Sequence, residues 1–289
     1  MKMKRIPSLL LCGAVLASAL TGCSGSGESS KTTADSAETV KTPVKKIHTL
    51  NIRAPKDISE ITATFMNTSN GKTEDVKMKK SGGDEKNTVF CCDGDVTKYN
   101  MVHLTYGEKT SMDVAFNSFI SGWDLEKDVL LPYVVGTEPV YDPEFETKTF
   151  QFDGRDKKVY IWTPADYDEK SEEKYSVIYM FDGQSILTTG IERGMDNDTV
   201  CWNVSEHVTS MMNVTGQKAI IVAVDNNDVY RDDELVPDLG TLNMDYEAKG
   251  VKEEDVSLKR GNDFADFLCD TAMPYINENY HVYTDAMHI

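Results

Sequence analysis

Positive charge is scarce in this chain of 289 residues. It contains 30 lysines and arginines against 48 aspartates and glutamates, which gives a formal net charge of −18 at pH 7. A surface of this sign repels the phosphates of nucleic acids. Nucleic acid is therefore excluded as an expected partner, and solubility alone is a sufficient reason for the acidity.

Cysteine pairs with the spacing of metal ligands are absent from the sequence. Cys91 and Cys92 lie next to each other in a strand-like run and point to opposite faces, so we interpret each as a small packed residue. Cys201 and Cys269 could form a disulfide only if their helices meet, and their state stays open. The sequence predicts no metal site and no cofactor.

Long apolar runs are also lacking, with one exception near the N-terminus. Basic residues precede an apolar run over residues 6–20, which is the layout of a secretory signal and is short for a membrane span. The run closes on Leu20-Thr21-Gly22-Cys23, which resembles a bacterial lipobox, where cleavage precedes a lipid-bearing cysteine. We predict a lipoprotein signal peptide over residues 1–22 and lipidation of Cys23; an ordinary signal peptide with an incidental cysteine is the alternative.

Residues 23–46 are rich in Ser, Gly, Thr, Lys and Glu and contain almost no large apolar side chain. Such a segment cannot bury enough surface to offset the entropy of ordering it. We interpret it as a flexible tether between membrane lipid and the folded part. The expected location is the extracytoplasmic face of a bacterial cell membrane, with Cys23 as the lipid anchor.

Apolar residues recur in short alternating stretches between residues 47 and 140, for example at 50–52 and 101–106. Period-two patterning with glycine and asparagine breaks predicts a small antiparallel β-sandwich domain. Hairpin turns are expected at Asn70-Gly71, at 81–84 and at 93–95. The aromatic residues Tyr99, Trp123 and Tyr133 could bind carbohydrate through their ring faces or could form the core.

The pattern changes after residue 140, where strand-like segments alternate with helices. Residues 149–152 and 159–162 predict an antiparallel pair joined through Asp153-Gly154. Residues 175–181 and 219–224 are nearly continuous apolar runs, as expected in a parallel sheet that is covered on both faces. A helix with an apolar face near Val204 and Val208 lies between them, and another begins at about Asn262. Residues 141–289 therefore predict an α/β sheet.

An ordered set of motifs in this second region resembles the putative esterases of the α/β-hydrolase superfamily, which include enterochelin esterase-like and feruloyl esterase-like enzymes. The set comprises Val159-Tyr160-Ile161-Trp162-Thr163-Pro164, Val177-Ile178-Tyr179-Met180-Phe181-Asp182-Gly183-Gln184, Trp202, Val224-Asp225-Asn226 with Arg231 and Glu234-Leu235, and Phe264-Ala265-Asp266-Phe267-Leu268 with Pro274-Tyr275-Ile276. The resemblance implies an α/β fold, a partial α/β-hydrolase sheet preceded by the β-sandwich domain.

Asp182-Gly183-Gln184 follows a buried strand at the carboxyl edge of the predicted sheet, where open α/β sheets bind ligands. A turn with a glycine brings bare backbone to that edge, and its N–H groups can face an oxyanion. The resemblance assigns one donor of an oxyanion hole to Gly183 or Gln184. A turn that needs glycine only for its dihedral angles is the alternative.

The resemblance also implies that residues around this edge shape a substrate pocket. They are Asp182, Trp202, Asn226, Arg231 and Glu234. Asn226 and the acidic stretch after Arg231 follow the next parallel strand, so they are expected at the same edge. A local salt bridge on a solvated loop is the alternative interpretation of Arg231 and Glu234.

Gly-x-Ser-x-Gly, the motif around the nucleophile of such esterases, occurs nowhere in the 289 residues. Ser185 follows the wrong strand, and His281 and His288 precede the position where the serine is expected. We therefore assign no catalytic residue within the chain and expect the serine, acid and histidine beyond Ile289.

Together these features predict a surface-anchored carboxylic ester hydrolase that forms a serine acyl-enzyme in the intact protein. Its expected partners are membrane lipid through Cys23 and an ester-bearing small molecule or polysaccharide. The alternative is a non-catalytic surface lipoprotein that binds a glycan or another ligand through the β-sandwich domain.

Overall fold

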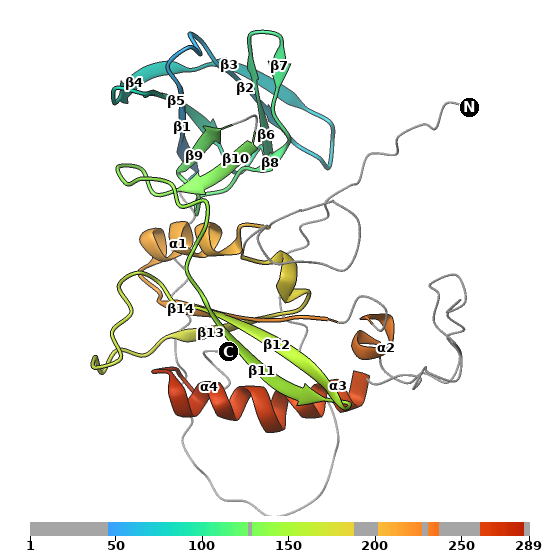
Figure 1. Cartoon of the computed structure of the whole chain (residues 1–289). Coiled ribbons are helices and arrows are strands. Elements are labelled where there is room, and N and C mark those ends of the chain that lie inside the picture. The colour runs from blue at the N-terminus through green and yellow to red at the C-terminus, as the bar shows by residue number, and fades with distance from the viewer. Residues whose placement is uncertain (1–45, 127–128, 188–201, 227–230, 237–260, 286–289) are drawn as a thin grey trace, which may run out of the picture. The chain divides into compact units, whose positions relative to one another are not determined.

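The computed structural model describes residues 46–126, 129–187, 202–226, 231–236 and 261–285 (Figure 1). The predicted signal peptide, Cys23, Cys201 and His288 lie outside the described residues, and so does most of the predicted tether. The predictions made for them are left as they stand.

The first described region is a β-sandwich of two sheets, as the period-two pattern predicts. One sheet has the strand order β10-β9-β1-β5-β4, and the other has the order β3-β2-β6-β7 with β8 also paired to β6. Their bounds are β1 Ile47–Pro55, β2 Thr62–Met66, β3 Thr73–Lys77, β4 Lys79–Gly83, β5 Asn87–Asp95, β6 Met101–Tyr106, β7 Lys109–Thr110, β8 Val114–Ala115, β9 Gly122–Glu126 and β10 Val129–Tyr133. One pair departs from the antiparallel prediction, because β1 and β9 run parallel. The chain forms β6, β7 and β8 of the second sheet before it returns to the first sheet as β9.

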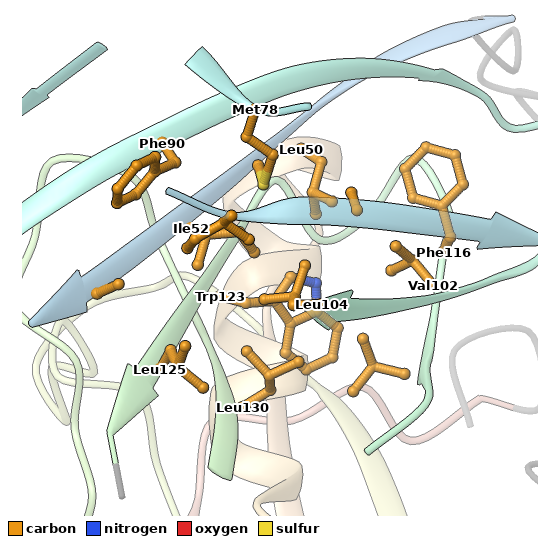
Figure 2. Close-up of a cluster of buried hydrophobic side chains, with 14 of the residues drawn as sticks. Leu50, Ile52, Met78, Phe90, Val102, Leu104, Phe116, Trp123, Leu125 and Leu130 are labelled. Atoms are coloured by element: carbon orange, nitrogen blue, oxygen red, sulfur yellow. The ribbon is translucent and has the colours of Figure 1, made fainter. Parts of the chain in front are cut away.

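Alternating side chains of the two sheets meet in one core (Figure 2). Leu50, Ile52 and Ala54 of β1 are each at most 1% exposed, whereas the residues between them are half-buried. Trp123 and Tyr133 are only 3% and 5% exposed, and Tyr99 packs against the same core. These aromatic residues therefore belong to the core, and a carbohydrate cannot stack on the buried rings of Trp123 and Tyr133.

Of the three predicted hairpin turns in this region, one is confirmed, one is displaced by a few residues and one is wrong. The turn at Asn70-Gly71 is confirmed, with Gly71 at φ +69°. Residues 81–83, in contrast, lie in β4, and the chain turns after them, where the Asp84 carboxylate accepts backbone N–H bonds from Lys86 and Asn87. Residues 93–95 lie in β5, where the Gly94 backbone passes so close to core rings that an added Cβ would be 2.6 Å from Phe116.

The second described region is built on a sheet with the strand order β11-β12-β14-β13. The strands are β11 Glu146–Phe152, β12 Arg155–Trp162, β13 Ser176–Met180 and β14 Ala219–Val224. The predicted antiparallel pair is confirmed as β11 and β12, joined by Asp153 and Gly154, both with positive φ. The predicted parallel neighbours are confirmed as β13 and β14.

Helices cover both faces of this sheet (Figure 1). Val159, Ile220 and Val222 face the cluster that contains Phe264 and Phe267, whereas the alternate residues Tyr160 and Ile221 face the cluster that contains Val208. The helical segments are η1 Gly183–Ser185, α1 Val204–Thr215, α2 Arg231–Leu235, α3 Gly261–Phe267, the π-helical η4 Leu268–Ala272 and α4 Met273–Asn279. The second region is thus a partial α/β-hydrolase sheet, as predicted.

The segment after α4 returns to the sheet beside Tyr175, the residue directly before β13. Tyr175 and Val282 form a parallel bridge, in which Tyr175 N donates to His281 O at 2.9 Å and Tyr283 N donates to Tyr175 O at 3.0 Å. This bridge lies on the side of β13 away from β14.

No helix within the described ranges has the length and apolar character that crossing a membrane requires.

Candidate functional site

The turn Asp182-Gly183-Gln184 lies where β13 ends, next to the end of its parallel neighbour β14. Parallel strands bring their carboxyl ends to one edge of a sheet, so residues 182–184 and Asn226 are expected to be close together. The structure confirms this, because Asn226 N donates to Gln184 Oε1 at 3.2 Å and Asn226 Nδ2 donates to Asp182 Oδ1.

The backbone of the turn is held by a left-handed residue followed by one 3-10 turn. Asp182 has φ 58° and ψ 39°, and Ser185 N donates to Asp182 O at 2.8 Å. Gly183 does not have a positive φ, so a residue with a side chain could adopt its backbone dihedral angles. A Cβ at Gly183 would instead lie 2.7 Å from backbone atoms of Ala223 and Val224. Glycine is therefore required here by close approach to β14.

Arg231, the first residue of α2, binds the carboxylate of Asp182 from across the sheet edge. Its Nε donates to Oδ1 and its Nη2 donates to Oδ2, both at 2.7 Å. A guanidinium and a carboxylate that share two parallel bonds fix each other's orientation as well as their separation. The Asp182 side chain is 18% exposed and the Arg231 side chain is 46% exposed, so the pair lies at the surface of the site.

Glu234, in contrast, belongs to a buried ion pair beneath this edge. Its Oε2 lies 2.6 Å from Lys157 Nζ, and the two side chains are 4% and 3% exposed. Lys157 also donates to the carbonyl oxygen of Asp225 at 3.3 Å and lies over the rings of Phe152 and Phe264. Both Arg231 and Glu234 thus have partners far away in the sequence, which differs from a local salt bridge on a loop.

Asp225 follows β14 directly, and its carbonyl oxygen accepts the bond from Lys157. Burial raises the pKa of its carboxyl group to about 6, although nearby Lys157 and the Lys158 backbone N–H act in the opposite direction. The Lys158 N–H donates to its Oδ1 at 3.0 Å, which ties the end of β14 to β12.

Trp202 lies beside the turn through its backbone, since its N–H donates to Ser185 O at 2.9 Å. Its side chain is 42% exposed, and that of Phe181, just before the turn, is 45% exposed. The structure therefore brings the turn, Asn226, Arg231 and Trp202 to one edge of the sheet. Their part in binding a substrate stays a prediction.

Sequence reasoning missed Lys157, although a signal for it was present. Lys157 alternates with Val159 and Ile161 along β12, so it shares their buried face and needs a buried counter-charge. The Asp182–Arg231 pair had no comparable signal, because neither residue alternates with buried residues along a strand.

The remaining candidates of the sequence take structural positions. Ser185 is 7% exposed within the 3-10 turn. The ring of His281 bonds through Nδ1 to the carbonyl oxygen of Ser171. Cys91 and Cys92 are free and half-buried, and Cys269 is free and exposed. In the described ranges, no group of three His, Cys, Asp or Glu side chains could hold a metal ion.

Residues 151–289 match the family described as putative esterase. The match covers just under half of the chain, so it shows which family this region resembles. The match contains the whole sheet edge from Asp182 to Glu234, so the residues that carry the resemblance in the sequence fall within the family region.

Solved structures similar to the chain include several esterases. An enterobactin esterase from Shigella flexneri is 10% identical, with 83% of this chain and 62% of that chain covered and a TM-score of 0.32. A CE1 ferulic acid esterase from Anaeromyces mucronatus is 22% identical, with 54% and 50% covered and a TM-score of 0.33. The BES protein from Bacillus cereus is 16% identical, with 52% and 51% covered and a TM-score of 0.33. The chain covers about half the length of the last two, and a comparison with curated proteins found no match.

Proposed function

We propose that the complete protein is a surface-anchored carboxylic ester hydrolase that acts through a serine acyl-enzyme. A lipidated Cys23 holds it on the extracytoplasmic face of a bacterial membrane. The serine hydroxyl attacks the ester carbonyl, the alcohol departs, and water then releases the acid. The substrate is an ester-bearing small molecule or polysaccharide, and the reaction needs no cofactor.

The observation that carries this proposal is the turn at residues 182–184, which lies inside the family match and at the carboxyl edge of two parallel strands. The backbone N–H of Gly183 or Gln184 is one donor of the oxyanion hole, and Asp182, Trp202, Asn226 and Arg231 surround it. One such donor stabilises the transition state by about 3 kcal/mol. The serine, the acid and the histidine follow in chain order, as in other α/β-hydrolases.

Ester hydrolysis by the protein made from its complete reading frame, without residues 1–22, tests the proposal. We expect turnover of a short-chain nitrophenyl ester and covalent labelling by a fluorophosphonate. Residues 24–289 alone are the matched control and should show no turnover above buffer, because loss of the nucleophile lowers turnover by about a million-fold. A complete protein that neither turns over the ester nor takes the label refutes the proposal.

Two other outcomes redirect the proposal. Turnover by residues 24–289 that Ser185→Ala abolishes would place the nucleophile in the 3-10 turn. Binding to a glycan panel by an inactive complete protein would favour the alternative of a non-catalytic lipoprotein. The burial of Trp123 and Tyr133 argues against that alternative, because it removes the sequence feature on which it rested.

A further inference from the structure

Asp182 adopts a backbone conformation that a residue with a side chain rarely keeps without help. Within the described ranges, the non-glycine residues with positive φ are Asp153, Asp182 and Asn203. The left-handed region brings Cβ close to the backbone carbonyl oxygen, and Asp and Asn adopt it more often than other residues with a Cβ but still at a cost. A residue held there at a sheet edge needs surrounding contacts that fix it.

Those contacts converge on the Asp182 side chain. Arg231 binds both carboxylate oxygens, and Asn226 Nδ2 donates to Oδ1. The two partners come from different elements, since Asn226 follows β14 and Arg231 begins α2. The carboxylate is therefore held from two directions, and rotation of Asp182 would break three hydrogen bonds.

The opposite side of the turn is limited by β14. Gly183 already lies so close to Ala223 and Val224 that no side-chain atom fits between them. Gln184 is 9% exposed and accepts a bond from Asn226 N. The Gly183 and Gln184 peptide groups thus lie between a fixed carboxylate and a fixed strand, and their direction depends on both.

We propose that Arg231 is a positioning residue that aims the oxyanion donors of Gly183 and Gln184 by clamping the Asp182 carboxylate. The proposal rests on the proposed function for the turn itself. Donors of this kind act only when they point at the place where negative charge develops, and a misplacement of about 1 Å can lower turnover about 100-fold. Arg231 need not touch the substrate for this effect.

The two parallel bonds make arginine specific for this role. A lysine at position 231 would keep the positive charge, but its single ammonium group cannot bind both carboxylate oxygens in a fixed plane. The clamp therefore depends on geometry and not only on charge. Arg231→Lys is the variant that separates these two properties.

A matched control exists in the hairpin between β11 and β12. Asp153 also has a positive φ of 54°, also precedes a glycine, and also pairs with an arginine, since Arg155 Nη2 lies 3.4 Å from Asp153 Oδ2. The Arg155 side chain is 34% exposed, close to the exposure of Arg231. Arg155→Ala removes a surface ion pair of the same residue types that lies in the β11–β12 hairpin and not at the turn of residues 182–184.

The experiment compares kcat and KM for a nitrophenyl ester in the complete protein and in its Arg231→Ala, Arg231→Lys and Arg155→Ala variants. We expect kcat to fall about 10- to 100-fold in Arg231→Ala, with KM within about twofold. Arg231→Lys should recover only part of the loss, and millimolar methylguanidine should restore part of kcat to Arg231→Ala. Arg155→Ala should keep the parental kcat.

Several results would overturn the proposal. They are an unchanged kcat in Arg231→Ala, an equal loss in Arg155→Ala, or full activity in Arg231→Lys. If Arg231→Ala does not fold, Arg231→Lys alone decides, because it retains the charge. Hydrogen exchange of residues 182–186 gives a readout without catalysis, and exchange must accelerate in Arg231→Ala but not in Arg155→Ala. A parent protein with no hydrolysis refutes the proposed function, whereas unchanged exchange refutes the clamp.

Discussion

Lys157 and Glu234 form an ion pair across 77 residues of sequence, with 2.6 Å between Nζ and Oε2 and almost no exposure of either side chain. The pair joins β12 to α2 directly below the end of β14. Arg231 is the first residue of the same short helix, so the buried pair also fixes the position from which Arg231 reaches Asp182. A buried charge without its partner is strongly unfavourable, so the pair ties the helix to the sheet.

Glu234→Gln should therefore destabilise the protein by about 3–5 kcal/mol, since it removes the carboxylate that is bonded to the buried Lys157 ammonium. The double replacement Lys157→Met with Glu234→Leu should restore most of the stability. Urea denaturation measures both. Glu60→Gln, which breaks an exposed pair with Lys77, is the control and should leave the midpoint almost unchanged. A double variant less stable than Glu234→Gln would contradict the expectation.

Gly183→Ala should destabilise the second region by about 1–3 kcal/mol, because the added methyl group meets backbone that cannot rotate away. Gly82→Ala is the matched control: nothing lies within 4 Å of the new Cβ and its φ is not positive. Thermal unfolding of the two variants gives the comparison. Equal melting temperatures would show that the turn can move off β14 at little cost.

Glu206 in α1 should make stability depend on pH. Burial raises the pKa of its carboxyl group to about 7 from an ordinary value of 4.5, so the folded protein binds the proton more tightly than the unfolded chain. This contribution is complete below pH 4.5 and is lost as the pH rises to about 7. Glu206→Gln should raise the melting temperature at pH 8 more than at pH 4.5.

The neighbouring His207 provides the opposite control, because burial lowers the pKa of its ring to about 4. Because the pKa of this ring is lower in the folded protein, the protein becomes less stable as the pH falls from 6.5 to 4. His207→Gln should therefore reduce acid sensitivity without changing the alkaline side. The Glu206 expectation is refuted if Glu206→Gln changes the melting temperature equally at both pH values.

Cys23→Ser should release the protein from the membrane fraction, since a thioether-linked lipid cannot form on serine. Cells that express the unaltered chain should incorporate a radioactive fatty acid, and the variant should not. Cys12→Ser, inside the predicted signal peptide, is the control and should leave labelling intact. An unlabelled wild-type protein would show that residues 1–22 are an ordinary signal peptide or none.

The sheet of the second region could be predicted because each of its strands is a local pattern of apolar residues in the sequence. The apolar runs at 175–181 and 219–224 indicated buried parallel strands, and their chain order placed Asn226 beside the turn. Gly94 shows where such reasoning fails, because a glycine between two aspartates is typical of a turn but here makes room for Phe65 and Phe116. That packing is decided by residues distant in the sequence.

The position of the candidate site could be predicted from the sequence, but its ion pairs could not. The position of residues 182–184 at the sheet edge followed from the strand that precedes them. The partner of each charge did not, because pairing depends on how helices return to the sheet. Arg231 and Glu234, three residues apart in one helix, consequently have different roles: Arg231 binds a carboxylate near the surface, and Glu234 neutralises a buried ammonium.

The bridge between Tyr175 and Val282 also sets a direction of travel for the chain. Since the bridge is parallel, Val282 and Tyr283 run in the same direction as β13, which ends at the sheet edge that carries Asp182. Two backbone hydrogen bonds at one residue, Tyr175, thus fix the orientation of a segment that lies far along the chain.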